Sequence, residues 1–405
     1  MKSITLQRIN FRLLNGCLLI GVLFSGCSDE EVPLSESFIK IYDNSNADLS
    51  YHPVDVAETI NGFITLSATE LSRSDFNGVQ LLKMDEEGNF VRERELPTYV
   101  NPIGKLYLNP SDSITYFFAM DPTSLNAVLI GINPQFQVEV EQEMIGLTYP
   151  LASAVTSTGN LLLLGYDHVS LETEISELSL DGTFISGTSY SIGPGDDVRE
   201  AIINHYLGEN DRPLPFFCGE VSTGNYYFNG FFNYSFSLVF TDFSDAPTGV
   251  VQGQDANAGV RATMPLNGNN FAIAGFQFSD NYQLSTATLN PSGISSSEAL
   301  YPGGNMAELK PYTPSQIIPY SGNKEMIIFA SETNGRQILL TFYDAGTGEI
   351  VGIHRLGYLN PFTFSSMKVA SDNSLLVLGT TFVAGRFERI VLSKISANEI
   401  SSITN

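Results

Sequence analysis

Runs of four or five apolar residues, each followed by one small residue, recur along the chain between short polar turns. Residues 160–165 and 374–379 are clear cases, because four consecutive aliphatic residues precede a glycine in each. Nearly continuous apolar runs of this length predict β-strands that are buried on both faces. Longer runs with helical periodicity are missing from the sequence, so we expect an all-β protein.

The small residue occurs seven times, at intervals of 45 to 65 residues. These small residues are Ser67, Ala119, Gly165, Gly230, Gly275, Ala330 and Gly379. A second strand-like segment follows each run and ends in a turn-forming residue: Asp85, Asn133, Asp181, Asp242, Asn290, Asp344 and Ser396. Repeats of roughly 40–50 residues are typical of four-stranded propeller blades. The pattern predicts a seven-bladed β-propeller of four-stranded antiparallel blades over residues 37–405, with a sandwich pair or a β-solenoid as alternatives.

Each landmark has a physical interpretation. A small residue lets neighbouring sheets approach closely, and an Asp or Asn side chain satisfies backbone groups in a hairpin turn. Residues 38–42 have the pattern of a strand and precede the first repeat, whereas residues 399–404 form only a short final segment. We therefore expect residues 38–42 to close the ring as the outer strand of the last blade.

The N-terminus has the three parts of an export signal. Lys2, Arg8 and Arg12 are basic, an apolar stretch of about a dozen residues follows, and residues 24–27 end in Cys27 after small residues. The apolar stretch is shorter than the roughly 20 residues of a membrane-spanning helix. Residues 1–26 are therefore predicted to be a lipoprotein signal peptide, with Cys27 as the lipidated residue, although cleavage elsewhere as an ordinary secretory signal is the alternative.

An acidic segment follows the predicted cleavage site and belongs to a tether of residues 27–36. Its residues Ser28, Asp29, Glu30 and Glu31 resemble the export tag of Bacteroidota lipoproteins that face the cell exterior. Taken with the predicted propeller, the chain is similar to Bacteroidota surface-exposed outer-membrane lipoproteins with divergent propellers. This resemblance implies a lipid-anchored accessory subunit of an outer-membrane complex, such as a nutrient importer of the starch-utilisation type or a secretion machinery. Periplasmic retention is the alternative location.

Composition limits the partners. The chain has 20 basic and 44 acidic residues, and cleavage after residue 26 would remove three basic residues and no acidic ones. The mature protein would then carry a net charge of about −27, which repels the phosphate backbone of nucleic acids and makes them an unexpected partner. Cys218 would be the single cysteine of the folded part, so no disulfide is expected within it.

Catalytic and cofactor motifs are not found in the sequence. The histidines are too dispersed in sequence for metal-ligand spacing: His52, His168, His205 and His354. Asp196 and Asp197 are interpreted as part of a solvated Gly-Pro loop, and Cys218 follows two phenylalanines and is expected to be a buried, inert thiol. We therefore expect no catalytic residue, no metal site and no cofactor.

Two aromatic features are candidates for a binding surface. A Tyr is followed within three residues by Pro before five of the seven repeats, and these tyrosines are Tyr51, Tyr99, Tyr149, Tyr312 and Tyr358. On one face of a propeller they would offer amphipathic contact area to a protein or a sugar, or they would pack beneath the loops instead. The dense aromatic segment 226–236 is either blade core or partly exposed.

The most direct functional hypothesis is a non-enzymatic surface lipoprotein that acts as a binding or scaffold subunit of an outer-membrane complex. The alternative is a glycan-binding or glycan-cleaving propeller in nutrient uptake. The sequence contains no Trp and no assignable pair of catalytic carboxylates, which disfavours this second hypothesis.

Overall fold

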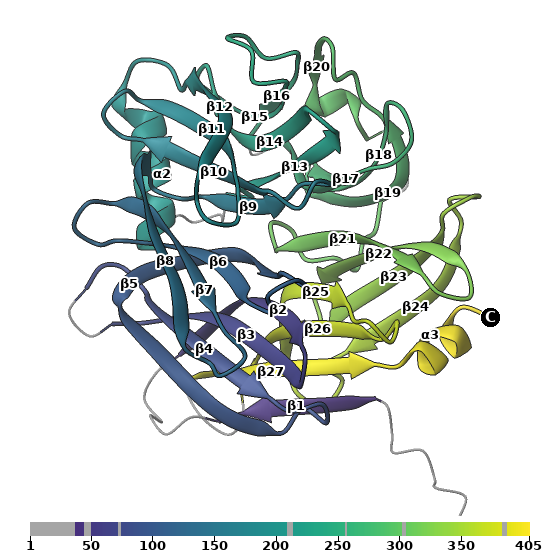
Figure 1. Ribbon diagram of the computed structural model, residues 1–405. Coiled ribbons are helices and arrows are strands. Elements are labelled where there is room, and N and C mark those ends of the chain that lie inside the picture. Colours follow the sequence, from purple (N-terminus) through teal and green to yellow (C-terminus); the bar gives the residue numbers. More distant parts are fainter. Residues whose placement is uncertain are drawn as a thin grey trace, which may run out of the picture. The chain divides into compact units, whose positions relative to one another are not determined.

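The computed structural model describes residues 37–43, 50–71, 74–208, 214–255, 257–301, 305–382 and 387–405. The predicted signal peptide, residues 1–26, and the tether, residues 27–36, lie outside the described residues, as do Cys27, Ser28, Asp29, Glu30 and Glu31. Ser37–Asn405 form one compact unit, which is nearly all β-structure (Figure 1). Neither of the two α-helices within the described ranges is long and apolar enough to cross a membrane.

The first sheet contains seven strands. In hydrogen-bonded order they are β2 (Tyr51–Thr59), β3 (Gly62–Thr69), β4 (Gly78–Met84), β5 (Phe90–Leu108), β6 (Thr115–Met120), β7 (Asn126–Ile132) and β8 (Val138–Thr148). The long strand β5 belongs to two antiparallel groups. Its first half pairs with β4 and its second half pairs with β6, and Val100 takes part in both pairings.

Two four-stranded sheets have the regular order of a meander. The first is formed by β9 (Ala152–Val155), β10 (Leu161–Asp167), β11 (Glu172–Leu178) and β12 (Phe184–Ser191). The second is formed by β21 (Ser315–Ser321), β22 (Glu325–Glu332), β23 (Ile338–Asp344) and β24 (Ile350–Leu356). Both follow the predicted four-stranded antiparallel unit.

Between them lie two sheets that depart from this unit. One contains β13 (Phe217–Ser222), β14 (Asn225–Phe232), β15 (Ser235–Thr241), β16 (Gly249–Gln254) and β20 (Ile294–Ser296), and the other contains β17 (Ala258–Pro265), β18 (Asn270–Gln277) and β19 (Asp280–Thr288). The short strand β20 follows β19 in the chain but pairs in parallel with β16. One sheet therefore gains a fifth strand, and the other has three.

The last sheet joins the two ends of the described chain. It is formed by β25 (Phe362–Val369), β26 (Leu375–Phe382), β27 (Glu388–Ile395) and β1 (Phe38–Tyr42). Strand β1 is antiparallel to β27, with Phe38 opposite Lys394 and Tyr42 opposite Ile390. The predicted closure by residues 38–42 is thus confirmed. The final segment is a helix, α3 (Ala397–Ile403), rather than a strand, and the Ser396 hydroxyl caps it by accepting a hydrogen bond from the Glu399 backbone N–H.

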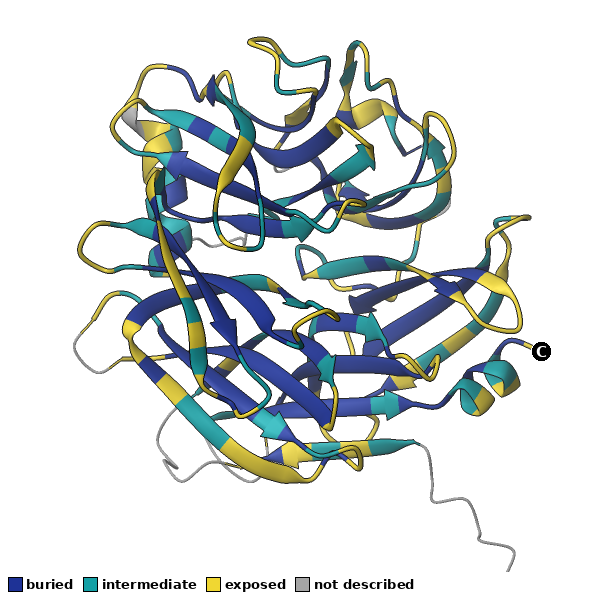
Figure 2. Cartoon of the chain, in the orientation of Figure 1, coloured by how far each residue is buried: buried dark blue, intermediate teal, exposed yellow. Residues whose placement is uncertain are grey.

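The first strand of each antiparallel group contacts the first strand of the next one, and these contacts form a closed ring. The ring runs through β2, β5, β9, β13, β17, β21 and β25, and β25 contacts β2 again. The fold is therefore propeller-like, with sheets arranged around an inner ring of strands. Buried residues occupy the middle strands of the sheets, and exposed residues occupy the outer strands and loops (Figure 2).

The seven predicted small residues all lie in equivalent strands, namely β3, β6, β10, β14, β18, β22 and β26. At three of them the reason for small size differs from the expected approach of neighbouring sheets. Ser67, Gly275 and Gly379 each pair with an inner-strand residue at a β-bulge. A Cβ added at Gly379 would lie 1.9 Å from the Thr363 carbonyl oxygen of the bulged strand. The bulge brings backbone of the same sheet close to this position.

The predicted turn residues are confirmed as local hydrogen-bond acceptors. The Asp344 carboxylate accepts bonds from the backbone N–H groups of Gly346 (2.9 Å) and Thr347 (2.8 Å). These bonds favour the ionised form and lower the pKa of Asp344. Its hydrogen-bonding capacity is used within the turn, as a structural role requires.

The nearly all-β structure agrees with the predicted fold class, but one insertion contains a helix where a Gly-Pro loop around Asp196 and Asp197 was predicted. Residues 193–215 contain the helix α2 (Asp196–Leu207). Ile202 and Tyr206 are buried one helical turn apart, and Val198 packs against the same hydrophobic cluster. Their spacing of four residues places the three side chains on one face of the helix. Apolar burial of this face holds the insertion against the sheets.

Candidate functional site

The inner strands enclose two adjoining cavities. One has a volume of about 400 Å³ and is lined by residues of β5, β13, β17 and β21, and the other has about 340 Å³ and is lined by residues of β2, β5, β9, β13 and β25. Both cavities are lined by Lys105, Phe216, Phe217 and Cys218. We call the two together the central channel. All seven strands of the inner ring contribute to its wall.

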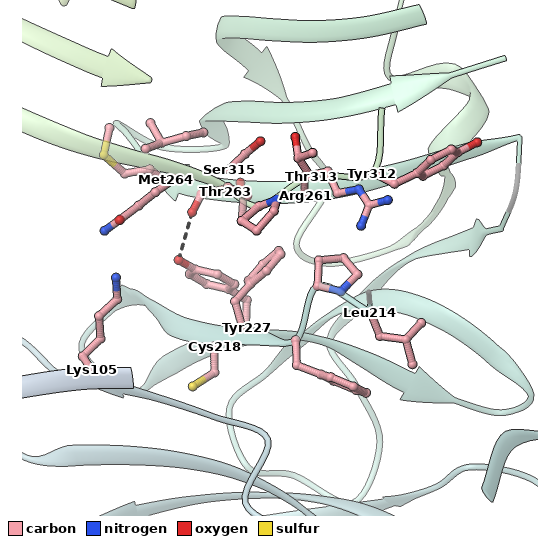
Figure 3. Close-up of a pocket in the computed structure, with 17 residues that line it drawn as sticks. Lys105, Leu214, Cys218, Tyr227, Arg261, Thr263, Met264, Tyr312, Thr313 and Ser315 are labelled. Atoms are coloured by element: carbon pink, nitrogen blue, oxygen red, sulfur yellow. Dashed lines mark hydrogen bonds between the residues drawn. The ribbon is translucent and has the colours of Figure 1, made fainter. Parts of the chain in front are cut away.

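The larger cavity, shown in Figure 3, differs in charge from the rest of the chain. Its charged lining residues are the cations Lys105 and Arg261, and no carboxylate is found among the described residues that line it. Acidic residues outnumber basic ones 44 to 20 in the whole sequence. Two cations without an acid in one cavity are therefore unusual for this chain.

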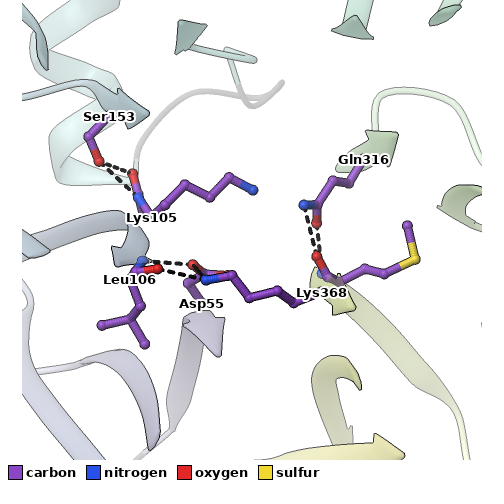
Figure 4. A network of polar contacts seen from close by, with 8 residues as sticks. Asp55, Lys105, Leu106, Ser153, Gln316 and Lys368 are labelled. Atoms are coloured by element: carbon purple, nitrogen blue, oxygen red, sulfur yellow. Dashed lines mark hydrogen bonds and ion pairs between the residues drawn. The ribbon is translucent and has the colours of Figure 1, made fainter. Parts of the chain in front are cut away.

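The acidic residue of the smaller cavity is neutralised by its own partners. Asp55 is 1% exposed, and its carboxylate accepts a 2.7 Å hydrogen bond from the Leu106 backbone N–H. The Lys368 Nζ lies 3.7 Å from the same carboxylate oxygen and donates a 2.6 Å bond to the Leu106 carbonyl. This network connects β2, β5 and β25 (Figure 4). The charges of Asp55 on β2 and Lys368 on β25 therefore compensate each other where the first and last sheets meet.

The backbone of Lys105 is held by the neighbouring strand β9. Its N–H donates a 2.8 Å hydrogen bond to the Ser153 hydroxyl, which in turn donates a 2.6 Å bond to the Gly104 carbonyl. The side chain extends from β5 into the space between the inner strands (Figure 4). Its Nζ makes no hydrogen bond or ion pair with the residues that the structure describes.

The Lys105 ammonium sits in an unfavourable environment. Solvent reaches the residue inside the channel, but surrounding protein replaces much of the bulk water around its charge. This desolvation lowers the pKa of Lys105, the nearby Asp55 opposes the shift, and Lys368 adds to it. The side chain is thus a positioned cation without an oppositely charged partner in direct contact.

Arg261, on β17, is held by aromatic rings. Its guanidinium carbon lies 5.1 Å from the ring centroid of Phe276 and 5.1 Å from that of Tyr312. The two rings are 4.8 Å apart in a T-shaped arrangement. Cation–π contacts of this kind orient the guanidinium plane. Arg261 and Tyr312 also line an adjoining, mostly apolar pocket of about 140 Å³, whose lining includes the acidic residue Asp255.

Cys218 lines the channel but lacks the properties of a nucleophile. It is 9% exposed, and burial raises the pKa of its thiol to about 12. The thiol therefore stays protonated at neutral pH, and the thiolate is the nucleophilic form. Its burial agrees with the interpretation made from the sequence.

The structure does not bring the five predicted tyrosines together as one exposed face. Tyr51, Tyr99 and Tyr149 are 4%, 6% and 9% exposed, as expected if they pack beneath the loops. Tyr312 is half-buried and lines the channel beside Arg261. Tyr358 is 88% exposed.

The aromatic segment 226–236 and His205 lie mostly within the packed interior. Most of segment 226–236 belongs to the buried parts of β14 and β15, whereas Tyr234 in the turn is 56% exposed. His205 packs on Phe216 with ring centroids 4.9 Å apart, and burial lowers its pKa to about 4. Within the described ranges, no group of three His, Cys, Asp or Glu side chains is placed to hold a metal ion.

The sequence analysis missed the charged residues of the channel. Asp55, Lys105, Arg261 and Lys368 lie on different inner strands and are far apart in the chain. The available signal was a charged residue within the first strand of a repeat, where apolar residues dominate. Only the ring of strands shows that these positions face one channel.

No protein-family model matches the sequence, and no curated protein matches it. The structure is similar to that of catalytically inactive virginiamycin B lyase from Staphylococcus aureus, with 12% identity and a TM-score of 0.47 over 89% of this chain and 100% of that chain. It is also similar to polysaccharide lyase Uly1, with 10% identity and a TM-score of 0.49 over 88% and 91% of the two chains. The β-propeller domain of the trilobed protease from Pyrococcus furiosus has 7% identity and a TM-score of 0.46 over 86% and 98%. At these values the similarities assign neither an activity nor a ligand to this chain.

Proposed function

We propose that this chain is a lipid-anchored, seven-bladed β-propeller at the cell surface that captures a ligand in its central channel. The observation that carries the proposal is the cavity of about 400 Å³, bounded by the inner strands, into which the Lys105 ammonium points. This volume falls within the range of roughly 300–1,000 Å³ found for small-molecule sites. A positioned polar group within a mostly apolar wall is typical of such sites.

The blade count is supported by the way β5 is shared. Counted separately, its two halves give seven antiparallel groups, and each group contains one of the seven small residues. The location is supported by Cys27 and the acidic residues after it. A lipid at Cys27 and the tether of residues 27–36 would hold the propeller close to the outer membrane.

Capture is favoured over catalysis by the chemistry of the described channel residues. The thiol of Cys218 stays protonated at neutral pH, whereas the two cations are suited to recognition of charge. The glycan-binding alternative places a sugar in the same cavity. The same experiment therefore tests both ligand classes.

A binding experiment with a filled cavity tests capture. Met264 lines the cavity on β17 and is half-buried, so Met264→Trp should occupy part of its space. The full chain, purified in detergent, is titrated with neutral and charged aromatic compounds and monosaccharides by calorimetry. We expect wild-type protein to bind at least one class and the Met264→Trp variant to lose at least tenfold in affinity. A ligand that binds both proteins equally would place the site elsewhere and overturn capture in the channel.

The lipid anchor is tested separately. Cys27→Ala should move the protein from the outer-membrane fraction to the soluble fraction, whereas Cys17→Ala, within the predicted signal, should leave it membrane-bound. Protease added to intact cells should cleave the wild-type protein if it faces the exterior. Membrane association of Cys27→Ala equal to that of the wild type would contradict the anchor.

Docking on an outer-membrane protein complex is a second candidate. It is favoured by Tyr358 and Leu359, which are adjacent and 88% and 91% exposed. Such residues are candidates for contact with a partner. The double change of Tyr358 and Leu359 to Ser should remove specific partners from a purification out of intact outer membranes. Unchanged co-purification would exclude this surface.

A further inference from the structure

We propose that the ligand of the central channel is a small organic anion, whose carboxylate, sulfate or phosphate group pairs with Lys105 while Arg261 provides a second cationic contact. This inference rests on the proposed function and specifies the ligand of the same site. It is carried by the position of Lys105, by the local charge and by the composition of the wall.

The position of Lys105 points to a missing partner. Lys105 is exposed to the solvent of the channel, and its ammonium has no ion pair with the described residues, so it is open to a charged ligand. Here its backbone is fixed by Ser153 and Gly104, and the Nζ points into the cavity (Figure 3). An anionic group in the cavity would supply the partner that the described residues do not provide.

The nearby charges leave the channel positive. The direct contacts of Asp55 are with Lys368 and with the Leu106 N–H, so Asp55 acts on Lys105 from a distance and forms no ion pair with it. The larger cavity adds Arg261 and has no carboxylate among its described lining residues. The described lining of the two cavities therefore carries two cations, Lys105 and Arg261, against the one carboxylate of Asp55, within a chain that is strongly acidic as a whole.

The side chains that line the cavity indicate the chemical character of the uncharged part of the ligand. Apolar side chains of Phe216, Met264 and Ile317 line the cavity together with the two cations. In Figure 3, Lys105 and Arg261 lie at opposite ends of the residues that line the cavity, and Arg261 lies beside Tyr312. Arg261 is also stacked with Tyr312, which offers an aromatic surface. An anion with an aromatic or sugar-ring body would use both kinds of contact, whereas an inorganic ion would use only the charges.

The test compares anions with neutral molecules of similar shape. The full chain in detergent is titrated calorimetrically with benzoate and benzamide, with glucuronate and glucose, and with phenyl sulfate and phenol. We expect at least one anion to bind at least tenfold more tightly than its neutral counterpart. If no anion binds the wild-type protein at millimolar concentration, or if each pair binds equally, the proposal is overturned.

Lysine variants assign the contact. Lys105→Met should weaken binding of the anion by about ten- to a hundredfold, the usual range for loss of one charge-assisted hydrogen bond, and leave binding of the neutral counterpart within about twofold. Lys105→Arg keeps the charge and should retain most of the affinity. Lys324→Met is the matched control, because it removes the same charge from an exposed turn. Circular dichroism verifies folding, and Arg261→Met provides an independent variant.

The outcomes separate this inference from the proposed function. If Met264→Trp abolishes binding but Lys105→Met and Arg261→Met both bind the anion as the wild type does, capture in the channel stands and anion recognition is refuted. If the anion binds Met264→Trp normally and Lys105→Met weakly, anion recognition stands and the assigned cavity is wrong.

Discussion

Tyr42 provides a direct test of ring closure, on which the channel depends. It is the last residue of β1, is 7% exposed, and donates a 2.8 Å hydrogen bond from its hydroxyl to the Gly88 carbonyl. It belongs to a cluster that combines residues of the first and last sheets: Val56, Phe63, Leu82, Met84, Leu376, Leu378, Ile390 and Leu392. One side chain therefore packs where the two ends of the ring meet.

The cost of removing this side chain follows from its burial. A tyrosine buries about 150–250 Å², and at about 25 cal/mol per Å² this amounts to about 4–6 kcal/mol as an upper estimate. Truncation of a buried aromatic residue to Ala costs about 3–5 kcal/mol. We expect Tyr42→Ala to lower the free energy of unfolding by about 4 kcal/mol. Tyr42→Phe removes only the bond to Gly88 and should cost about 1 kcal/mol.

Urea unfolding followed by circular dichroism measures both changes. Ile39→Ala is the control, because Ile39 lies on the same strand but is 56% exposed, and its loss should change stability by about 0.5 kcal/mol or less. A cost for Tyr42→Ala no larger than that of Ile39→Ala would show that β1 does not close the ring. If Tyr42→Phe cost as much as Tyr42→Ala, this would refute the inference that burial of the Tyr42 aromatic ring, rather than its hydrogen bond, provides most of the stabilisation.

Three further changes test the close packing and the buried charges, each by urea unfolding. Gly379→Ala puts a Cβ against the Thr363 carbonyl and should lower the free energy of unfolding by about 1–3 kcal/mol. Gly335→Ala is the control, because its Cβ would have its nearest neighbour 3.5 Å away, and it should be neutral or stabilising. Equal effects of the two changes would refute the packing argument. The pKa of Lys105 is lowered by desolvation, so folding disfavours its charged form. Lys105→Met should therefore be more stable than the ligand-free wild type at neutral pH, and the difference should shrink as the pH approaches the ordinary pKa of lysine. A difference that does not change with pH would contradict this. Burial raises the pKa of Glu174 from 4.5 to about 7. Its contribution to folding stability is therefore complete below pH 4.5 and is lost as the pH rises to about 7. Glu174→Gln should remove this pH dependence, and an unchanged dependence of stability on pH would exclude Glu174 as its source.

The repeat pattern could be predicted because its causes are local. A turn residue such as Asp344 bonds the backbone two and three residues ahead, and a buried middle strand needs a continuous apolar run. Both signals survive in a short window of sequence. The parallel pairing of β20 with β16 has no such signal, because it joins segments more than 40 residues apart. Helix α2 was missed because its apolar face is short and begins directly after a Gly-Pro-Gly segment.

The residues of the candidate site were harder to predict from the sequence than the fold. The Tyr and Pro landmarks drew attention to Tyr51, Tyr99 and Tyr149, but these side chains are buried and support the loops. The sequence analysis did not identify Lys105 and Arg261 as site residues, because a single charged residue in a strand has no distinctive pattern until its surroundings are known. Their importance follows from what faces them across the ring, and this depends on contacts between strands distant in sequence.

The separation of charge between the surface and the channel explains how an acidic protein would select small anions. Exposed strands such as β8 carry many of the acids, including Glu139, Glu141 and Glu143. Salt screens these surface charges within about 10 Å, whereas Arg261 is half-buried and its charge is screened less. We expect a long polyanion such as a nucleic acid to be repelled, because it would meet many acidic residues at once and could not place all its charges inside the channel. A small anion that enters the channel leaves this field and meets Lys105 and Arg261 at short range. If the channel binds anions as proposed, the acidic surface would exclude large polyanions and the cations of the channel would select small ligands by charge.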